Sequence, residues 1–297
     1  MMTAPTQPLL RGELRFDESL KRYNSWRVGG AATQLYLPAD SDDLAVFLRT
    51  LPSGEPLLWL GLGSNLLIRD GGFRGTVIGL QGRLNELRIN GSEVEVDAGV
   101  ACAKVARECA RAGLAGAAFL AGIPGTMGGA LAMNAGAFGG ETWSIVRTVA
   151  TIDRLGVMRW REPDDYRVSY REVVRPREEW FLSCTLDLAP GDADAEQLAI
   201  RRLLERRAAT QPTGQPSCGS TFRNPPGDYA ARLIEASGLK GFRIGGAEVS
   251  TKHANFIINT GDASAADIEQ LILHVQAEVA RRQEVHLQAE VHMVGEP

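Results

Sequence analysis

The stretch Gly122-Ile-Pro-Gly-Thr-Met-Gly-Gly129, which continues as Ala130-Leu-Ala-Met-Asn-Ala-Gly-Ala-Phe-Gly-Gly140, decides how the rest of the chain is interpreted. Seven of its nineteen residues are glycine, and none carries a charge. Each glycine inside a helix costs about 1 kcal/mol relative to alanine, so we predict that this run is not helical. Uncharged, glycine-dense backbone can turn successive N–H groups toward a phosphate. A tightly packed turn between core strands would have the same composition, and spacing alone does not separate the two interpretations.

A second glycine-rich turn follows the apolar run Pro56-Leu-Leu-Trp-Leu-Gly61, which is predicted to be a buried strand. The turn Gly61-Leu-Gly63-Ser-Asn65-Leu66 imitates the start of a dinucleotide-binding G-x-G-x-x-G motif. The third glycine is missing and no amphipathic helix follows, so a Rossmann fold is excluded. Two such loops, about sixty residues apart, predict one phosphate-bearing cofactor held between two subdomains.

The composition is that of an ordinary globular chain of one large or two medium domains. Its 297 residues are 44% apolar and 23% charged, with a net charge of −4, which gives no electrostatic footprint for nucleic acid or a membrane surface. No apolar run approaches the roughly 18–20 residues of a transmembrane helix. The N-terminus lacks the basic and apolar parts of an export signal, so we expect a cytoplasmic protein. The four cysteines show no C-x-x-C spacing, which predicts free buried thiols and no metal site.

Local patterns predict several helices and strands. An Asn90-Gly91 pair between two alternating segments predicts a hairpin over residues 87–96. Ser41 is expected to be the N-cap of a helix that runs through Leu51. A final strand over 285–294 is expected to carry Glu290, and the arginines of a helix over 195–209 are taken as a solvated face. Apolar periodicity also predicts helices at 101–112, 228–237 and 264–282, and strands near 33–38, 56–60, 74–79, 146–153, 157–161, 180–188 and 254–259.

Seven motifs along the chain together resemble one known family, the UDP-N-acetylenolpyruvoylglucosamine reductases (UDP-N-acetylmuramate dehydrogenases), flavoenzymes of bacterial cell-wall precursor synthesis. The resemblance runs from about Asn24 to Gly295, and the order of the motifs makes it specific. The motifs are Asn24-Ser-Trp-Arg-Val-Gly-Gly30, Gly61-Leu-Gly-Ser-Asn-Leu-Leu67, Gly122-Ile-Pro-Gly-Thr-Met-Gly-Gly129, Tyr166-Arg-Val-Ser169, Cys218-Gly-Ser-Thr-Phe-Arg-Asn-Pro225, Gly245-Gly-Ala-Glu-Val-Ser-Thr-Lys-His253 and Leu287-Gln-Ala-Glu-Val291.

The resemblance implies an α+β fold and an activity. A two-part FAD-binding domain of the vanillyl-alcohol-oxidase type is expected over residues 1–190, and a C-terminal α/β substrate-binding domain over 195–297. The implied reaction is the NADPH-dependent reduction of the enolpyruvyl group of UDP-N-acetylenolpyruvoylglucosamine to UDP-N-acetylmuramate, with FAD as the intermediate carrier. The short stretch from Arg171 to Gln215 resembles the shorter subclass of the family.

Carried over residue by residue, the resemblance places the FAD site on the two glycine loops. Phe138 stands where the family usually has a tyrosine, so it is left out of the site. All four histidines lie in the last fifth of the chain, so the first half offers none for covalent flavin attachment and we expect non-covalent FAD. The implied cofactor-binding residues are Gly61, Gly63, Ser64, Asn65, Leu66, Gly122, Ile123, Pro124, Gly125, Thr126, Gly128, Gly129, Asn134 and Gly136.

The resemblance implies Ser220 as the proton donor, because it follows Cys218-Gly219 as in the family motif. A positioned hydroxyl can protonate C2 of the enolpyruvyl group as enolate-like charge develops. The structural alternative is a turn serine that caps a backbone N–H group.

Two further catalytic residues are implied by position. Arg167 matches the arginine of the family's Tyr-Arg-x-Ser motif and would bind the substrate carboxylate. A surface ion pair with Asp164 or Asp165 is its structural alternative. Glu290 matches the family's C-terminal glutamate, and its apolar neighbours predict a raised pKa. Its alternative is a solvent-facing strand residue.

The UDP moiety needs cations or donors, for which Arg223, Asn224, Arg243 and Lys252 are the nearby candidates. Thr210 stands where some relatives carry a lysine before Gln-Pro, so a different cation is expected to take that role. We expect a small-molecule substrate, an enolpyruvyl ether of a UDP-sugar, and a monomer or weak oligomer.

Two other functions stay open. One is another non-covalent FAD oxidoreductase of the same fold, acting on an alcohol or sugar, which would reoxidise rapidly with O₂ but not with the enolpyruvyl substrate. The other is a catalytically silent nucleotide-binding regulator, against which the presence of Arg167, Ser220 and Glu290 argues.

Overall fold

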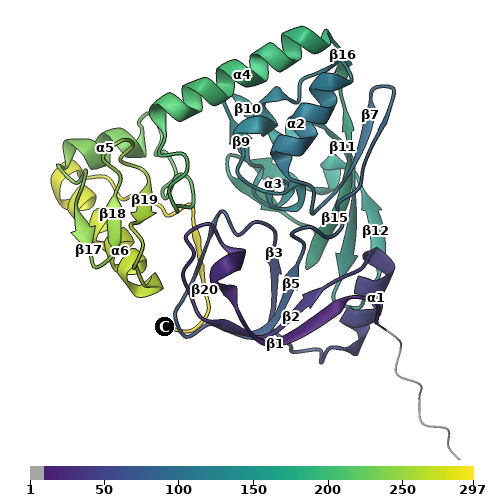
Figure 1. Cartoon of the computed structure of the whole chain (residues 1–297), viewed down its shortest axis with the longest axis horizontal. Helices are drawn as coiled ribbons and strands as arrows, with labels where there is room; N and C mark the ends of the chain where they lie inside the picture. Colours follow the sequence, from purple (N-terminus) through teal and green to yellow (C-terminus); the bar gives the residue numbers. More distant parts are fainter. Residues whose placement is uncertain (1–9) are drawn as a thin grey trace, which may run out of the picture.

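The computed structural model describes residues 10–297, and its larger part is built on two β-sheets (Figure 1). The first sheet has strand order β1-β2-β5-β3. In that sheet β2, β5 and β3 run parallel, while β1 is antiparallel to β2. The Pro56–Gly61 run therefore contains a strand, β3, that leads into the glycine loop of residues 61–66, as predicted. The bounds are β1 Glu13–Ser19, β2 Ala31–Leu37, β3 Leu57–Leu60 and β5 Phe73–Gly79.

Helix α1 (Ser41–Thr50) buries Leu44, Phe47 and Leu48 in a cluster shared with the first sheet. The N-cap of α1 is Asp40, whose side chain accepts a hydrogen bond from the backbone N–H of Asp43 at 2.9 Å. The predicted cap at Ser41 is therefore wrong by one residue. The carboxylate of the preceding Asp40 accepts the capping hydrogen bond that was expected for the serine hydroxyl.

The second sheet is antiparallel throughout and has strand order β12-β11-β15-β7-β6. The hairpin predicted from Asn90-Gly91 is β6–β7, with Gly91 in the left-handed region at φ +61°. Strands predicted near 146–153, 157–161 and 180–188 are also present. The bounds are β6 Leu87–Asn90, β7 Glu93–Asp97, β11 Val146–Asp153, β12 Met158–Arg161 and β15 Glu179–Asp187.

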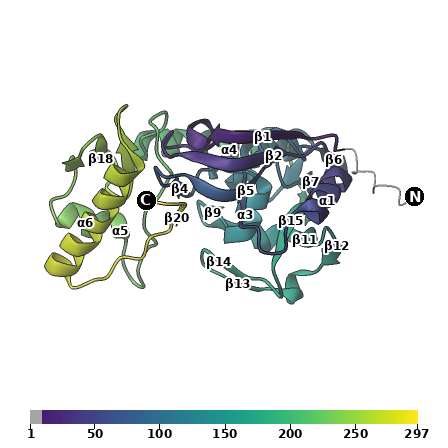
Figure 2. The same ribbon diagram turned by 90° about the horizontal axis from the view of Figure 1, so that it is seen from below.

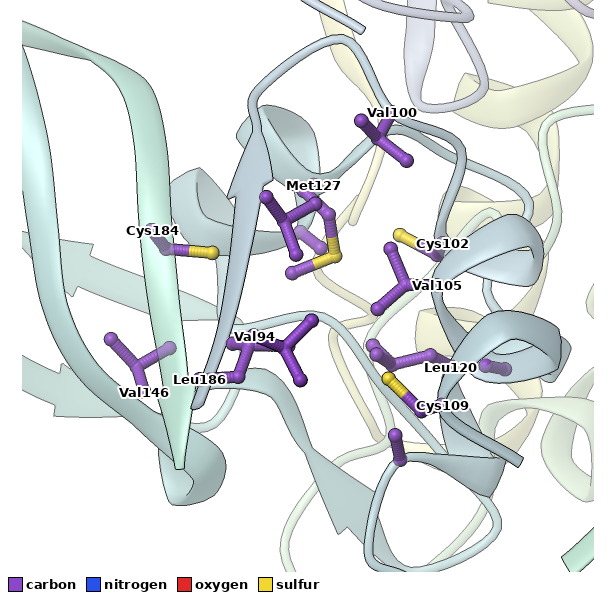
Figure 3. Close-up of a cluster of buried hydrophobic side chains, with 14 of the residues drawn as sticks. Val94, Val100, Cys102, Val105, Cys109, Leu120, Met127, Val146, Cys184 and Leu186 are labelled. Carbon is purple, nitrogen blue, oxygen red and sulfur yellow. The ribbon is translucent and has the colours of Figure 1, made fainter. Parts of the chain in front are cut away.

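Helix α2 (Cys102–Arg111), helix α3 (Met127–Met133) and the 3₁₀ helix η2 (Ala118–Gly122) pack on the second sheet. Figure 3 shows their shared core, with the sulfurs of Cys102, Cys109 and Cys184 on separate side chains. All four cysteines are free and buried, which confirms the prediction of free buried thiols. Burial raises the pKa of Cys102 to about 12.

The glycine-rich run contains helix α3, so the prediction that the run is not helical is wrong. A Cβ added at Gly128 would lie 2.9 Å from the Cβ of Ala98, which shows that close packing requires glycine inside this helix. The backbone N–H of Gly128 also donates to the carbonyl of Ala98 at 2.8 Å. Tertiary packing therefore outweighs the low helix propensity of glycine here.

A long helix, α4 (Ala193–Thr210), runs between the larger part and a smaller C-terminal part (Figure 1). It packs on α2 and η2, and Ile200 belongs to the core of the second sheet. The division of the chain between residues 190 and 195 stays a prediction, and we propose that α4 is grouped with the part on which it packs.

The C-terminal part consists of helices α5 and α6 and a small antiparallel sheet of order β17-β18-β19. The predicted helix over 264–282 is α6 (Ala265–Gln283), and its N-cap Ser264 accepts from the backbone N–H of Asp267 at 3.0 Å. Its core side chains recur at helical spacing: Ile268, Leu271, Ile272, Val275 and Val279. The other bounds are α5 Ala230–Ala236, β17 Arg243–Ile244, β18 Ala247–Val249 and β19 Ile257–Asn259.

The last strand of the chain returns to the larger part, where β20 (His292–Val294) pairs in parallel with β4 (Leu66–Ile68) (Figure 2). The predicted strand over 285–294 is thus only three residues long. Glu290 lies just before it, in a segment joined to the chain near Phe222 by an isolated bridge between Phe222 and Ala289. A bidentate ion pair between Arg69 and Glu269, at 2.7 and 2.8 Å, also ties the two parts together.

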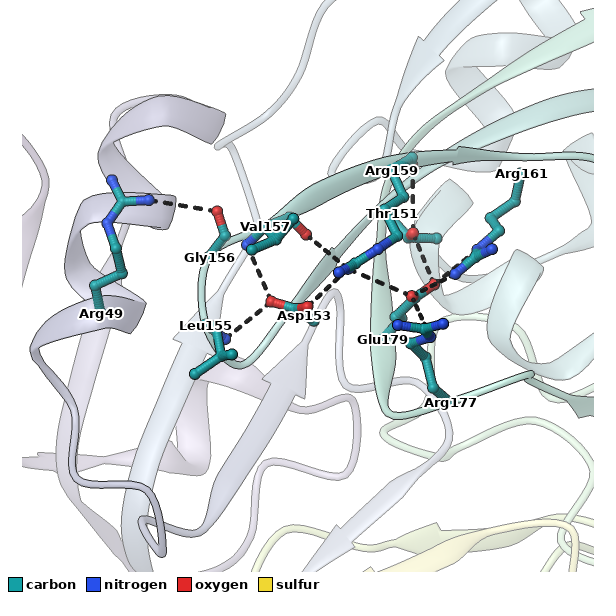
Figure 4. Close-up of polar contacts among 10 residues, drawn as sticks. All are labelled: Arg49, Thr151, Asp153, Leu155, Gly156, Val157, Arg159, Arg161, Arg177 and Glu179. Carbon is teal, nitrogen blue, oxygen red and sulfur yellow. Dashed lines mark hydrogen bonds and ion pairs between the residues drawn. The ribbon is translucent and has the colours of Figure 1, made fainter.

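A buried carboxylate, Glu179, begins strand β15 and contacts side chains of the two neighbouring strands β11 and β12 (Figure 4). Glu179 is 1% exposed, pairs with Arg161 at 2.8 Å and accepts from the hydroxyl of Thr151 at 2.9 Å. Arg159 and Arg177 lie within 3.6 and 3.4 Å of the same carboxylate. Burial alone would raise the pKa of Glu179, but the hydrogen bonds and charges of these neighbours hold it below its ordinary value.

The remaining elements are short. They include a hairpin, β13 (Arg167–Ser169) with β14 (Glu172–Val174), that the sequence did not predict. No helix in the described part of the chain is long and apolar enough to span a membrane. The other bounds are η1 Leu20–Tyr23, β8 Leu114–Ala115, β9 Gly136–Ala137, β10 Gly140–Glu141, η3 Thr142–Ile145, η4 Pro163–Asp165 and β16 Ala189–Pro190.

Candidate active site

A cavity of about 790 Å³ opens where the two glycine loops meet the C-terminal part. Of the fourteen residues predicted to bind FAD, all but Gly128 and Asn134 line it. Gly128 faces Ala98 instead. Asn134 is buried behind the wall, where its amide donates to Glu141 at 2.9 Å and its side-chain oxygen accepts from the N–H of Trp143 at 3.1 Å.

The two loops form a cradle that fits a diphosphate. A Cβ at Gly61 would lie 2.4 Å from the hydroxyl of Thr126, so the loops touch each other directly. A Cβ at Gly125 would instead make only ordinary contacts, at 3.4 Å from the hydroxyl of Ser64 and 3.9 Å from Ile123, and Gly125 lines the cavity. Within the described residues, none of the N–H groups of 62–65 donates to a backbone carbonyl. Free N–H donors around an open, glycine-lined space are what an anionic diphosphate requires, so the residues present fit FAD.

Glu290 projects into the cavity from the segment that precedes β20. Its side chain is 13% exposed, and Oε1 accepts from Nε of Arg171 at 3.0 Å. Its backbone N–H donates to the carbonyl of Thr221 at 2.8 Å, and its carbonyl accepts from the amide of Asn65 at 3.0 Å. Burial raises the pKa of Glu290, as predicted, and the positive charge of Arg171 opposes that rise.

The structure does not place Arg167 in the site. Its side chain is exposed on β13 and does not line the cavity. Arg171, four residues later, lies at the turn of the β13–β14 hairpin with φ +59° and lines the cavity. Its guanidinium donates to the carbonyl of Gly136 at 2.9 Å as well as to Glu290. The sequence holds two Tyr-Arg pairs, Tyr166-Arg167 and Tyr170-Arg171, and the second was the signal that sequence reasoning missed.

Ser220 lines the cavity beside Gly219, which adopts φ +77°. The next residue, Thr221, bonds through its backbone to Asn255 and to Glu290, each at 2.8 Å. The structure therefore brings Ser220, Glu290 and Arg171 to one cavity from three separate segments of the chain.

The four residues predicted to bind the UDP moiety do not line this cavity. Arg223 donates to the carbonyl of Arg171 at 3.2 Å, and Asn224 accepts from the N–H of Ala230 at 3.1 Å, at the start of α5. Arg243 forms an ion pair with Glu248. Lys252 donates to the carbonyl of Ala208 near the end of α4. Each of these side chains thus has a local structural partner.

Other cations line the cavity, namely Arg175, Arg206 and Arg207. Arg207 is half-buried, and its Nε donates to the side-chain oxygen of Gln211 at 3.1 Å. Burial lowers the pKa of Arg207, and no carboxylate in the described part of the chain offsets that effect. The arginines of α4 were predicted to form a solvated face. Their concentration just before Gln211-Pro212 was the sequence signal that could have indicated cations at the cavity.

A second cavity of about 420 Å³ continues from the first. It shares Ser64, Pro124 and Arg207 with the main cavity and extends along the loop from Pro212 to Ser217. Two histidines, His253 and His292, complete the wall of the main cavity, and burial lowers the pKa of both. Among the described residues no cluster of side chains could hold a metal ion.

Comparison with known proteins agrees with this geometry. Residues 32–160 match the model of an FAD binding domain, and residues 211–294 match the C-terminal domain of UDP-N-acetylenolpyruvoylglucosamine reductase. The chain is 62% identical over 295 residues to the UDP-N-acetylenolpyruvoylglucosamine reductase of Alkalilimnicola ehrlichii, covering 99% of each chain. It is 59% identical over 287 residues to that of Methylococcus capsulatus, covering 96% of this chain and 94% of the relative.

A solved structure is also similar. The crystal structure of UDP-N-acetylenolpyruvylglucosamine reductase from Thermus caldophilus superposes with a TM-score of 0.82 at 33% identity, covering 96% of this chain and 99% of that one. Identity above 55% along nearly the whole length, together with the cavity between the two glycine loops, leads to one conclusion. The chain belongs to the UDP-N-acetylenolpyruvoylglucosamine reductase family.

Proposed function

We propose that this protein reduces the enolpyruvyl group of UDP-N-acetylenolpyruvoylglucosamine, with NADPH as the electron donor and FAD bound without a covalent link. The observation that carries the proposal is the meeting of Ser220, Arg171 and Glu290 at the wall of a cavity whose other wall is the pair of glycine loops. FAD, when bound, accepts a hydride from NADPH and delivers one to the substrate carbon. Everything else is supplied by side chains and backbone of this chain.

The two glycine loops are proposed to hold the FAD diphosphate through the free N–H groups of 62–65, beside Gly125 at the cavity wall. Gly61 and Gly122 act differently, because their missing Cβ atoms let the loops pack against Thr126 and Phe138. Phe138, where the family usually has a tyrosine, packs against Gly122 and also lines the cavity.

Arg171 takes the role that the sequence assigned to Arg167. Its guanidinium is held at the cavity wall by the carbonyls of Gly136 and Asn134, at 2.9 and 3.3 Å, and by Glu290. A fixed guanidinium in a partly closed cavity can bind a carboxylate and stabilise the charge that moves onto it during reduction.

Ser220 is proposed to donate a proton to C2 of the enolpyruvyl group as negative charge develops there. The partly buried Glu290, whose pKa is raised by burial, can donate or accept a hydrogen bond on the same side of the cavity. Arg207, with Arg175 and Arg206, is proposed to bind ligand phosphates, in place of Arg243 and Lys252. A half-buried guanidinium without a carboxylate partner is stabilised by an anionic ligand.

The remaining expectations are part of the same proposal. The net charge of −4 supports a protein that does not bind nucleic acid. We propose that it acts in the cytoplasm, as a monomer or weak oligomer.

The visible spectrum of the purified protein tests the proposal. The protein is expected to be yellow, to bleach anaerobically with NADPH, and to regain its colour when the enolpyruvyl substrate is added. Acid or heat is expected to release the flavin into solution. Reoxidation by O₂ but not by the enolpyruvyl substrate would instead favour an oxidase acting on an alcohol or sugar.

A further inference from the structure

Arg223 lies where three separate segments of the active site meet. Its backbone N–H donates to the carbonyl of Gln288 at 2.9 Å, two residues before Glu290. Two residues before Arg223, the carbonyl of Thr221 accepts from the N–H of Glu290 at 2.8 Å. Phe222 and Ala289 form an isolated bridge between these two hydrogen-bonded pairs. The backbone of 221–223 is thus hydrogen-bonded along the segment that carries Glu290.

The side chain of Arg223 extends to the third segment, the β13–β14 hairpin. Its Nη2 donates to the carbonyl of Arg171 at 3.2 Å, and Arg171 adopts the left-handed backbone conformation, with φ +59°. A non-glycine residue in this conformation is strained and persists where its surroundings hold it. The Nε of Arg223 is buried and has no hydrogen-bond partner among the described residues. Arg223 is not among the residues that line the cavity.

We propose that Arg223 is a positioning residue, which holds the strained backbone of Arg171 and adds positive charge near Glu290 without touching the ligand. This inference rests on the proposed function of Arg171 and Glu290. It replaces the role of a phosphate ligand that the sequence suggested for Arg223, since the side chain is directed at the hairpin carbonyl.

The effect of Arg223 on the charge of Glu290 depends on all the charged and titratable groups near that carboxyl. Arg171 faces it from the hairpin, Arg223 from the bridge segment and the Cys218 thiol from the loop before Ser220, while His292 lies two residues further along its own segment. Burial raises the pKa of Glu290, and the charges of Arg171 and Arg223 oppose that rise, Arg171 more strongly. Loss of either arginine should therefore raise the pKa of Glu290 further.

Three variants of the FAD-loaded enzyme separate charge from orientation. Arg223→Met removes both the positive charge and the hydrogen-bond donor to the Arg171 carbonyl. Arg223→Gln keeps a donor but loses the charge, and Arg223→Lys keeps the charge. Arg232→Met is the control, because Arg232 is an exposed cation of α5 that pairs with Asp228 outside the cavity. The titration of the Glu290 carboxyl is followed by ¹³C NMR of glutamate-labelled protein, assigned by its loss in Glu290→Gln. Stopped-flow absorbance follows flavin reduction by NADPH and reoxidation by substrate.

We expect the pKa of Glu290 to be highest in Arg171→Met. It should be raised by a smaller amount in Arg223→Met and Arg223→Gln, and should stay near the wild-type value in Arg223→Lys and Arg232→Met. Reoxidation should fall up to about tenfold in Arg223→Met, the effect of one lost hydrogen bond, and less in Arg223→Gln. Flavin reduction should stay unchanged in all of them. An unshifted titration in both uncharged variants would overturn the proposal. If Arg223→Met fails to retain FAD, Arg223→Gln carries the same comparison. A wild-type enzyme that the substrate does not reoxidise would refute the proposed function, while the titration would still test Arg223.

Discussion

The space beside Gly125 provides the sharpest test of the cofactor site, through the substitution Gly125→Ala. An ideal Cβ at this position lies 3.4 Å from the hydroxyl of Ser64 and 3.9 Å from Ile123, both ordinary contacts. The backbone there is also outside the left-handed region, so alanine fits the free protein without strain. Replacing glycine at such a site stabilises a fold by about 0.4–1 kcal/mol through the unfolded chain. The added methyl group nevertheless occupies the open cradle between the two loops.

The expected loss is therefore in cofactor affinity alone. Each hydrogen bond to a charged phosphate that the methyl group prevents is worth about 1.5–3 kcal/mol, or roughly a ten- to hundredfold increase in the Kd of FAD. Gly128→Ala is the matched control from the same run. Its Cβ would lie 2.9 Å from that of Ala98, and such overpacking costs about 1–3 kcal/mol of folding stability.

The assay has two readouts on deflavinated protein. Fluorescence quenching of added FAD gives the Kd, and the thermal midpoint of the FAD-free protein gives the stability. Gly125→Ala should lose FAD affinity with an unchanged or higher midpoint, whereas Gly128→Ala should lower the midpoint. If Gly125→Ala binds FAD as tightly as wild type, this loop is a packed turn and the reasoning is refuted.

Three further predictions concern catalysis and stability. Ser220→Ala should leave flavin reduction by NADPH intact but slow reoxidation by the substrate about 10²–10⁴-fold, as measured by stopped flow; a defect below about tenfold would make Ser220 a turn residue. Arg171→Met should slow reoxidation about 10²-fold or more, whereas Arg167→Met should change it by about twofold or less, and the reverse result would restore Arg167 to the site. Glu179→Gln should lower the free energy of unfolding by about 3–5 kcal/mol at pH 7, measured by urea denaturation. Because the pKa of Glu179 is held below its ordinary value of 4.5, the stability that it confers is complete above pH 4.5 and is lost as the pH falls further, a loss that the variant should not show.

Most of the residues that the sequence assigned to the cofactor line the cavity, and their binding of FAD stays a prediction. Glycine-dense loops can be recognised from residue type alone, because glycine lets the backbone turn its N–H groups toward one point. Helix α3 escaped prediction for the opposite reason. Gly128 is required by its contact with Ala98, thirty residues earlier, and composition alone cannot separate a glycine that binds from one that packs.

Local sequence could not show which of two arginines lies at the cavity. Arg167 and Arg171 each follow a tyrosine, and their side chains have the same chemistry. A hairpin turn separates them, since it leaves Arg167 exposed on a strand and turns Arg171 toward Glu290, 119 residues away. Local sequence also could not show that Arg243 and Lys252 lie away from the cavity. Arg243 and Lys252 find partners within their own neighbourhood, whereas Arg207 on α4 faces the cavity.

The pairing of β20 with β4 has a consequence for how the protein is made. The carbonyl of Asn65, in the glycine loop of residues 61–66, accepts from the N–H of His292 at 3.0 Å. This loop therefore leaves the ribosome more than two hundred residues before the strand that pairs beside it. Cofactor loading is therefore expected to wait until β20 has been synthesised. A chain that stops after Glu284 should keep both large sheets by circular dichroism yet fail to retain FAD on gel filtration; stable FAD binding by that fragment would show that the loop is complete without its last partner.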